Sequence, residues 1–412
     1  MRILGSPVYY GWNVLTVAAA CELLAMGATA YAAGLFVLPM QQEFHISRAA
    51  ANSPVIILYL GAAVVAPFVG RMLDHRPARL MVSVGAVLLG FALAVIAMTS
   101  SLLVMALMLF LPAAIGLAAV GPLMTQALVT RWFSRHRGLA LGIAAVASSG
   151  GGFVVVPLLS IAIQAFGWRH GLLYEAIVLT FVIIGLAFFV LRNGPEDMGL
   201  GEHPELQGQS RARGRVERLR WREFLASGAF WIPSLTLAGI SGTAQATVIT
   251  LVPYGIQLGF APASAALLIS VFSLFAAITK IVAGILADRV NQRILLVLAA
   301  LFMTLSWLSL SLSSTYGAIF AGACLAGIAL GCALPTTAGL IAMRFGPERF
   351  GSVMGWTYAF TCICAIASVL FAGSVFDRTH GYVLAFEVFL ILMGSLAVAT
   401  LVFARSARGV RI

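Results

Sequence analysis

Lys280 is the residue whose position points most directly to chemistry, because it is the only lysine in the chain and lies in an apolar stretch. It stands eight residues before Asp288, so a helix would hold it roughly 12 Å from that end at ~1.5 Å per residue. A cation at the centre of a membrane span costs ~2.5–3.5 kcal/mol. We therefore expect Lys280 to face a bundle interior or a water-filled cavity, where it would bind an anion. The alternative is a structural lysine that extends toward the interface. Small residues are expected to share its helical face: Ser273, Ala276, Ala277, Ala283, Gly284 and Ala287.

Glu22 is the second charged residue that lies far from any polar stretch. It follows Trp12 by ten residues, so a helix would place it ~15 Å deep, similar to the depth of Lys280. A carboxyl group in apolar surroundings holds a proton more readily than one in water, and Glu22 is therefore a candidate proton-coupling site. Two alternatives stay open: an ion pair with Lys280, and a bond to a neighbouring helix that serves packing alone.

Hydroxyl groups line one face of a later apolar stretch. Thr243, Thr247, Thr250 and Tyr254 are spaced by 4, 3 and 4 residues, which places them on the same side of a helix. We expect this face to form a cavity wall, and the alternative is hydrogen bonding between packed helices. Further candidates for a substrate-binding surface are Tyr31, Gln126, Tyr358 and Cys362.

A short motif of glycine, aspartate and arginine occurs twice, and each residue of the second copy lies 214 positions after its counterpart. A carboxylate at a helix end can pair with nearby arginines and with the positive end of a neighbouring helix. We expect both copies to form a cytoplasmic gate, and the alternative is charge that only sets topology. The gate residues are Gly70, Asp74 and Arg79, and Gly284, Asp288 and Arg293.

The composition indicates a membrane protein that crosses the bilayer many times. The chain is 61% hydrophobic and only 9% charged, far less charged than a soluble protein of 412 residues. The net charge of +11 comes from arginines in short loops, so it indicates topology rather than nucleic-acid binding. The five cysteines lie in apolar segments and predict neither a disulfide framework nor a metal site. No nucleophile–base arrangement is visible, so we expect no enzyme and no cofactor.

The apolar segments predict an all-α membrane protein with twelve transmembrane helices in two six-helix, pseudo-symmetric bundles. The expected domains are an N-terminal bundle at 1–192, a cytoplasmic linker loop at 193–226 and a C-terminal bundle at 227–412. The expected spans are 12–38, 50–70, 80–99, 102–128, 139–165, 171–191, 228–257, 264–287, 294–313, 316–342, 352–374 and 381–404.

The arginines predict the orientation. If both termini and the linker face the cytoplasm, only Arg48, Arg169 and Arg378 fall in the outer loops. Loops on the cytoplasmic side of a membrane protein carry the excess of Lys and Arg. We therefore expect an integral protein of the cell inner or plasma membrane with both termini cytoplasmic. It would contact membrane lipid and exist as a monomer.

The repeated Gly-x3-Asp-x4-Arg pattern, after the second and eighth spans, resembles the signature loop of the major facilitator superfamily. The resemblance to this superfamily covers essentially the whole chain. The stretch from Trp132 to Gly150, WFSRHRGLALGIAAVASSG, resembles the entry to span 5 of the monocarboxylate transporter and oxalate:formate antiporter families. Tyr10-Gly11-Trp12, before the first span, is similar to the former family.

The resemblance implies the major facilitator fold and a small carboxylate as substrate, carried with a proton or in exchange. These families place an arginine in span 8, shortly before the Gly-x3-Asp loop, and Lys280 occupies that position. Ala276 stands where animal members have an aspartate, and Ala32-Ala33-Gly34 has no counterpart to their span 1 lysine. Arginine grips a carboxylate with two parallel bonds, whereas lysine is a point charge. The sign of the substrate therefore carries over, but its shape does not.

Together these observations predict a secondary active transporter of a small organic anion, foremost a monocarboxylate, that works by alternating access with proton coupling. A carboxylate exchanger is the first alternative, followed by a drug or metabolite exporter. The exporter arrangement Gly-Pro-x-x-Gly-Gly is absent from span 5, and Lys280 would repel cationic drugs. A sensor that keeps the fold without transport is the least favoured alternative.

Overall fold

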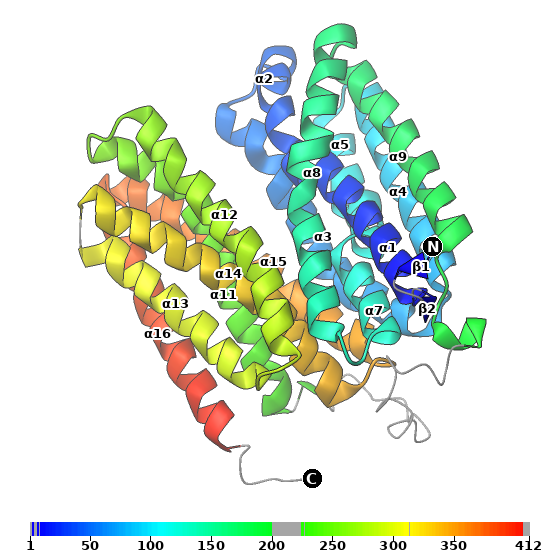
Figure 1. Cartoon of the computed structure of the whole chain (residues 1–412). Coiled ribbons are helices and arrows are strands. Elements are labelled where there is room, and N and C mark those ends of the chain that lie inside the picture. Colours follow the sequence, from blue (N-terminus) through cyan, green and yellow to red (C-terminus); the bar gives the residue numbers. More distant parts are fainter. Residues whose placement is uncertain are drawn as a thin grey trace. The chain divides into compact units, whose positions relative to one another are not determined.

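The computed structural model describes residues 2–3, 6–7, 9–199, 224–225, 227–312 and 314–406, and this part of the chain is almost entirely helical (Figure 1). The predicted all-α class is therefore confirmed. A short antiparallel hairpin, β1 (Arg2–Ile3) and β2 (Ser6–Pro7), precedes the first helix. The α-helices are α1 (Gly11–Met26), α2 (Ala33–Phe44), α3 (Arg48–His75), α4 (Ala78–Met98), α5 (Leu102–Met108), α6 (Ala114–Val120), α7 (Pro122–Trp132), α8 (Arg137–Phe166), α9 (Trp168–Val190), α11 (Gly228–Gln257), α12 (Pro262–Ala287), α13 (Gln292–Leu312), α14 (Tyr316–Phe345), α15 (Phe350–Thr379) and α16 (Val383–Ser406).

Twelve helical spans among the described residues are long and apolar enough to cross a membrane, which confirms the predicted number. The first span is longer than the predicted 12–38, because it runs from Gly11 to Phe44. Gln41, Gln42 and Glu43 favour helix, so the helix continues after the apolar stretch has ended. It stops where His45 adopts a left-handed conformation with φ of 50°.

Two spans contain a wider, π-helical segment. These segments are η1 (Gly27–Tyr31), between α1 and α2, and η2 (Leu109–Ala113), between α5 and α6. Pro112 lies within η2, and a proline disrupts the regular hydrogen-bond ladder of a helix. The same span is interrupted again at Gly121, which leaves helical geometry with ψ of −152° before α7 begins. Single π-helical turns often occur at functional sites, so both spans are candidates for such a site.

The first of two compact units comprises Met1–Glu217 and Phe345–Ala359. Within it, α4 packs along α9 and α6, and α1 packs along α8. The close fit of α4 to α9 depends on Gly90, because a side chain there would overlap the Thr180 hydroxyl. Thr180 itself donates a hydrogen bond to the Ala176 carbonyl oxygen at 2.7 Å. The packed helices of this unit fix the side chains that α1 and α8 present to each other.

The second unit comprises Arg218–Arg344 and Phe360–Ile412. In it α13 packs along α16, and α11 contacts α12 and α16. Trp307 of α13 is completely buried, with its ring centroid 5.3 Å from that of Phe386 and 4.9 Å from that of Phe389. Burial of such large rings makes this aromatic group the centre of the α13–α16 contact.

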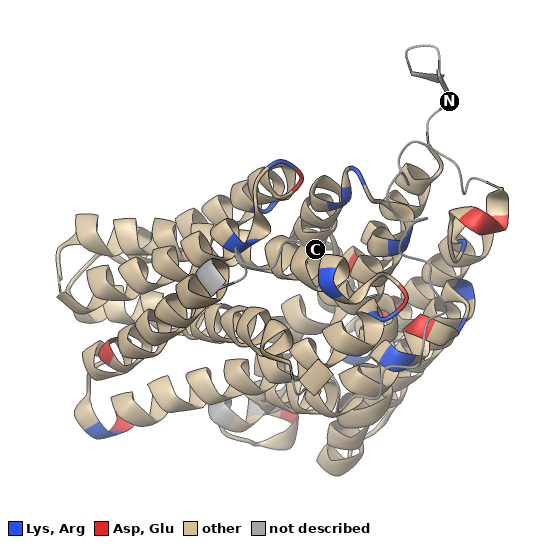
Figure 2. Cartoon of the chain, turned by 90° about the horizontal axis from the view of Figure 1, so that it is seen from below, with Lys and Arg blue, Asp and Glu red and all other residues tan. Residues whose placement is uncertain are grey.

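Charged residues are sparse on the described helices, as the colouring of Figure 2 shows. The short 3-10 helix η3 (Pro195–Met198) follows α9 and carries Glu196 and Asp197. The predicted linker at 193–226 falls largely on residues 200–223 and 226, which lie outside the described residues. The expected domain boundaries at 192 and 227 therefore stay a prediction.

Candidate functional site

Lys280 is buried in the second unit, with 8% of its surface exposed. The small residues predicted to share its face include Ala276, Ala283 and Ala287, and all three are buried as well. Gly331 of α14 lies against this turn of α12, since a Cβ atom there would come within 2.5 Å of the Ala276 carbonyl oxygen and 3.1 Å of the Lys280 amide nitrogen. The glycine thus lets the α14 backbone approach the turn that carries the lysine.

The hydroxyl face predicted on α11 exists, but its threonines bond to their own helix. Thr243, Thr247 and Thr250 are buried, and each donates to the carbonyl oxygen four residues earlier, at 2.8, 3.1 and 2.9 Å. A hydroxyl that donates to the backbone keeps its acceptor lone pairs and has no proton left for an anion. These threonines are therefore better placed to accept hydrogen bonds than to donate them.

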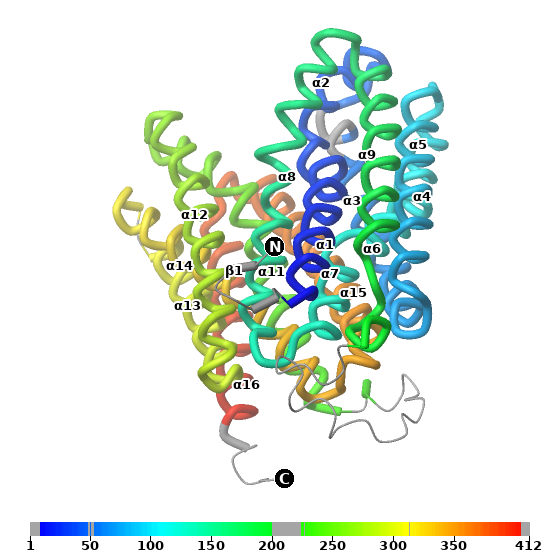
Figure 3. Tube along the Cα trace, turned by 45° about the vertical axis from the view of Figure 1, so that its right-hand side comes forward, coloured from blue at the N-terminus to red at the C-terminus, as the bar shows by residue number. Residues whose placement is uncertain are grey.

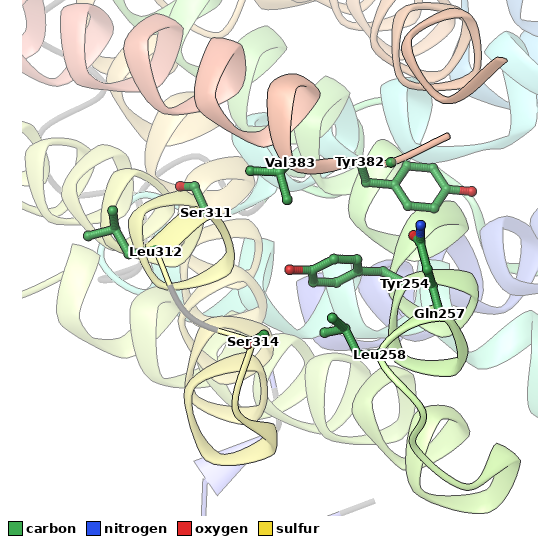
Figure 4. A pocket seen from close by; sticks show the side chains of 9 residues that line it. Tyr254, Gln257, Leu258, Ser311, Leu312, Ser314, Tyr382 and Val383 are labelled. Carbon is green, nitrogen blue, oxygen red and sulfur yellow. The ribbon is translucent and has the colours of Figure 1, made fainter. Parts of the chain in front are cut away.

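Tyr254, at the end of the same face, lines a pocket of about 440 Å³ near the C-terminal end of α11. Its hydroxyl donates to the Leu310 carbonyl oxygen at 3.4 Å. Figure 4 shows its ring extending into the space that Leu258, Ser311 and Val383 surround. The nine residues that line the pocket are all uncharged, so nothing in its lining offers a counter-charge to an anion.

Gln126 and Tyr358 lie together in the first unit. Gln126 follows the interruption at Gly121, is only 3% exposed, and directs its Nε2 atom to the Tyr358 hydroxyl at 3.5 Å. Its Oε1 atom has no hydrogen-bond partner among the described residues. A buried amide oxygen without a partner is costly, and such a group is suited to meeting a ligand. Cys362 lies one turn after Tyr358 on α15, is buried, and belongs to the second unit.

Glu22 is almost completely buried on α1, with 1% of its surface exposed, and its Oε1 atom accepts a hydrogen bond from the Ser148 hydroxyl of α8. Tyr31, in η1, is hydrogen-bonded to the neighbouring Ser149 and lies close enough to Glu22 to interact with it electrostatically. The structure thus brings two predicted residues, Glu22 and Tyr31, to the same pair of serines.

Asp74 binds the start of α15. Its Oδ1 atom accepts from the Gly351 amide at 2.8 Å, and its Oδ2 atom accepts from the Ser352 amide and hydroxyl at 2.7 and 2.5 Å. The first amides of a helix have no partner within the helix and carry a partial positive charge. The Asp74 carboxylate, which α3 supplies, accepts hydrogen bonds from these amides and also complements their positive charge.

Gly70 allows this contact, because a Cβ atom at Gly70 would overlap the Gly351 carbonyl oxygen, and one at Gly355 would overlap that of Ala66. Ala66 and Gly70 on α3, like Gly351 and Gly355 on α15, are spaced by four residues. Small residues at this spacing are typical of helices whose backbones touch inside a membrane.

The predicted gate residues Asp74 and Arg79 have different partners within the first unit, and their shared role in a gate stays a prediction. Arg79 donates to the Leu191 carbonyl oxygen at 3.3 Å and lies over the Phe188 ring, both at the end of α9. It is Arg131 of α7 that attracts Asp74 electrostatically, and it also donates to the Leu73 carbonyl oxygen. The sequence contained one signal for this role, because Arg344 repeats Arg131 at the matching end of span 10.

The second copy of the motif has a different environment. Gly284 is buried, whereas Asp288 is exposed at the C-terminal end of α12. Arg293 lies over the Phe403 ring, 5.5 Å from its centroid. In both copies the arginine lies over a phenylalanine ring near the end of the last span of its unit, Arg79 over Phe188 and Arg293 over Phe403, whereas the aspartates differ in exposure.

The two stretches that carry the family resemblance contact each other. The Trp12 ring lies 4.9 Å from that of Phe133, and the Tyr10 ring 5.8 Å from that of Trp132. Tyr10 also donates to the Val190 carbonyl oxygen at 2.9 Å. This cluster joins the start of α1 to the ends of α7 and α9, a pairing that a single sequence does not reveal.

Comparison with known proteins identifies relatives along the chain. The sequence profile of the Major Facilitator Superfamily matches residues 18–266 and 235–411. The chain is 25% identical over 373 residues to the uncharacterized MFS-type transporter YcxA of Bacillus subtilis, covering 89% of each protein. It is 31% identical over 284 residues to monocarboxylate transporter 11 of Homo sapiens, covering 68% of this chain and 57% of that one. The crystal structure of the human organic anion transporter MFSD10 covers 96% of this chain and all of its own, with a TM-score of 0.69 at 17% identity, and so shares the fold.

Proposed function

We propose that this chain carries a small organic anion by alternating access. The chain belongs to the major facilitator superfamily and is a secondary transporter rather than an enzyme. A monocarboxylate is the foremost candidate, and a proton accompanies it. The names of two similar proteins, a monocarboxylate transporter and an organic anion transporter, support an anionic substrate.

Lys280 is the observation that carries the proposal. A cation held in an apolar helix with 8% exposure has lost much of its contact with water, and an anion recovers part of that cost. The ammonium group donates charge-assisted hydrogen bonds, which are the strong ones in proteins. Gln126 and Tyr358 remain candidates for further substrate contacts. The other proposed contacts are Tyr31, Thr247, Thr250, Tyr254 and Cys362.

Glu22 supports proton coupling. Its carboxyl group is buried and bonded to a serine hydroxyl, so it can hold a proton away from bulk water. Moving one proton together with one monocarboxylate transfers no net charge. The membrane potential, worth ~2.3 kcal/mol per charge per 100 mV, would then neither drive nor oppose the cycle.

Asp74 is the centre of the proposed cytoplasmic gate. Its three hydrogen bonds to the first turn of α15 would break when the gate opens and form again when it closes. Gly70 lets the helices meet, and Arg131 supplies the nearby positive charge. The other proposed gate residues are Arg79, Gly284, Asp288 and Arg293.

The proposal includes a place in the cell. Twelve spans make this an integral membrane protein, and the arginine distribution favours the inner or plasma membrane with both termini cytoplasmic. We propose a monomer as the working unit.

The test is binding of acetate, pyruvate and L-lactate to the purified full chain, measured as a shift in melting temperature, because a ligand stabilises the state that it binds. Lys280→Ala should weaken binding by roughly 10- to 150-fold, since a charge-assisted hydrogen bond is worth ~1.5–3 kcal/mol. Lys280→Arg should keep anion binding with an altered ranking. Arg289→Ala, which removes an exposed cation just after the same helix, is the matched control and should bind normally.

Unchanged binding by a folded Lys280→Ala variant would overturn the proposal. A loss of stability of ~3–5 kcal/mol in that variant, without an effect on anions, would instead mark Lys280 as one partner of a structural ion pair. Uptake that depends on an internal carboxylate and not on a pH gradient would favour the exchanger alternative.

A further inference from the structure

We propose that Tyr31, Ser149 and Ser148 form a hydroxyl relay that carries the proton to and from Glu22. The inference rests on the proposed function of Glu22 as the proton-coupling site, and it adds the route by which a buried carboxyl group meets water. All four residues belong to the first compact unit and lie on α1, η1 and α8.

Contacts connect the relay at both ends. At the inner end, the Ser148 hydroxyl donates to Glu22 Oε1. At the outer end, the Tyr31 hydroxyl is hydrogen-bonded to Ser149, and Tyr31 is close enough to Glu22 for the two to interact electrostatically. Ser148 and Ser149 are consecutive on α8, so their side chains leave the helix in different directions, and in the proposed relay a water molecule bridges their hydroxyl groups.

Glycines hold the two helices at the required distance. A Cβ atom at Gly151 would lie 2.5 Å from both the Gly27 amide nitrogen and the Leu23 carbonyl oxygen, so the backbones of α1 and α8 touch. Figure 3 shows α1 and α8 running beside each other, in agreement with their extensive packing. The glycine triplet that follows Ser149 thus brings the serines within reach of Glu22.

The direction of a helical side chain explains how Tyr31 reaches the site. Tyr31 comes nine residues after Glu22, a rise of roughly 13 Å at ~1.5 Å per residue. Side chains on a helix point back toward its N-terminus, and a tyrosine is long enough to return its hydroxyl by several ångströms. Its ring packs against Gly152, where a Cβ atom would be 3.3 Å from Tyr31 Cδ1.

Exposure decreases along the relay. Tyr31 is 41% exposed, the two serines are half-buried, and Glu22 is 1% exposed. This order agrees with a proton route that begins at the surface of the span and ends at a buried acid.

The proton balance of one loading step is simple. Ser148 gives its hydroxyl proton to the Glu22 carboxylate, which becomes a neutral acid. Ser148 regains a proton from Ser149 through the bridging water, and Ser149 regains one from Tyr31. Tyr31 takes the replacement proton from bulk water, so one proton enters and one ends on Glu22. Unloading reverses each transfer.

Other titratable groups lie on the elements that pack against α1 and η1. Arg131 and Arg137 bond to the carbonyl oxygens of Leu73 and Phe133, and Arg169 bonds to Glu43, so these charges are held at helix ends. Glu175, on α9, is a further carboxyl group within these spans and needs its own control. The full set is Cys21 on α1, Glu43 on α2, Arg131 on α7, Arg137 on α8, and Arg169, His170, Tyr174 and Glu175 on α9.

The experiment follows the protonation of Glu22 itself and needs no substrate. The purified full chain is exposed to a light-triggered pH jump from a caged proton, and the infrared carbonyl band of the protonated carboxyl group is recorded with time. The band is assigned to Glu22 if Glu22→Gln abolishes it and Glu175→Gln does not. Tyr31→Phe and Ser149→Ala should each slow its appearance by roughly 10-fold or more, as expected on removing a positioned proton-transfer group. The midpoint of the equilibrium titration should stay the same.

Matched controls distinguish a relay from a structural role. Tyr174→Phe removes an exposed tyrosine hydroxyl on α9, and Ser160→Ala removes a serine hydroxyl further along α8; both should load at the normal rate. A normal rate in Tyr31→Phe would overturn the relay while leaving Glu22 as the proton site. A shifted midpoint without slowing would also overturn it, because that result marks a structural contact. If the unmodified protein shows no band that depends on Glu22, the proton-coupling proposal fails as well.

Discussion

At the scale of single residues, type and depth together indicated two charges that the fold buries, but they did not reveal the partners of those charges. Lys280 and Glu22 stand out because a charge in an apolar span is costly, and both are buried as that cost requires. The sequence did not reveal Ser148 as the partner of Glu22, since this depends on which spans pack together. It also did not show that the threonine hydroxyls of α11 donate to their own backbone.

Glu22→Gln should uncouple transport from protons while leaving exchange in place. The amide resembles the protonated acid in shape and polarity but has no proton to release. In proteoliposomes, uptake driven by a pH gradient should disappear, and counterflow between labelled and unlabelled substrate should persist. Glu43→Gln, which changes an exposed carboxylate near the end of the same span, should keep both activities. Gradient-driven uptake by Glu22→Gln would contradict the assignment.

At the scale of elements, the helices follow from the sequence, and their irregularities do not. A span needs ~20 apolar residues, a signal strong enough to locate all twelve. The π-helical segments and the interruption at Gly121 depend on how prolines and glycines are accommodated by neighbouring helices, which hydropathy does not encode. The capping of α15 by Asp74 likewise depends on which helices are neighbours. The aspartate at the end of span 2 indicated only that its carboxylate would meet a helix terminus.

Gly351→Ala should destabilise the packing of α3 against α15. A Cβ atom there would overlap the Gly70 carbonyl oxygen and come within 2.7 Å of Asp74 Oδ1, and both helices would have to move apart. Overpacking of this kind costs ~1–3 kcal/mol, and a clear fall in melting temperature is expected. The control is Gly373→Ala on the same helix, where no atom lies within 4 Å of the added carbon. Equal melting temperatures for the two variants would refute the prediction.

At the scale of the whole molecule, the internal repeat predicted the number of spans in each half. It did not predict that the two repeated aspartates differ in exposure. Asp74 is half-buried against α15, while Asp288, at the same place in the repeat, is exposed. Equal sequence in the two copies therefore does not give the two aspartates equal exposure. The contact-based units also assign Phe345–Ala359 to the first unit, a grouping that chain order alone does not suggest.

Orientation in the membrane is a prediction for the molecule as a whole. With both termini inside, Ser314→Cys, after α13, should react with a membrane-impermeant maleimide in sealed cells. Gly199→Cys, after η3, should react only once the membrane is opened. The unmodified protein, whose five cysteines all lie in apolar segments, gives the background. The reverse labelling pattern would invert the assignment of every loop.

The Asp74 contact also has a consequence for how the protein is made. Asp74 and Gly351 are 277 residues apart, so at ~5–20 residues per second the ribosome needs roughly 15–55 s to supply the partner after the aspartate has emerged. Throughout that interval this carboxylate lacks its partners on α15. The hydrogen bonds to Gly351 and Ser352 can form only after the start of α15 has been synthesised. A chain that stops before residue 345 keeps an open acidic end on span 2, a feature by which a truncated product differs from the finished transporter.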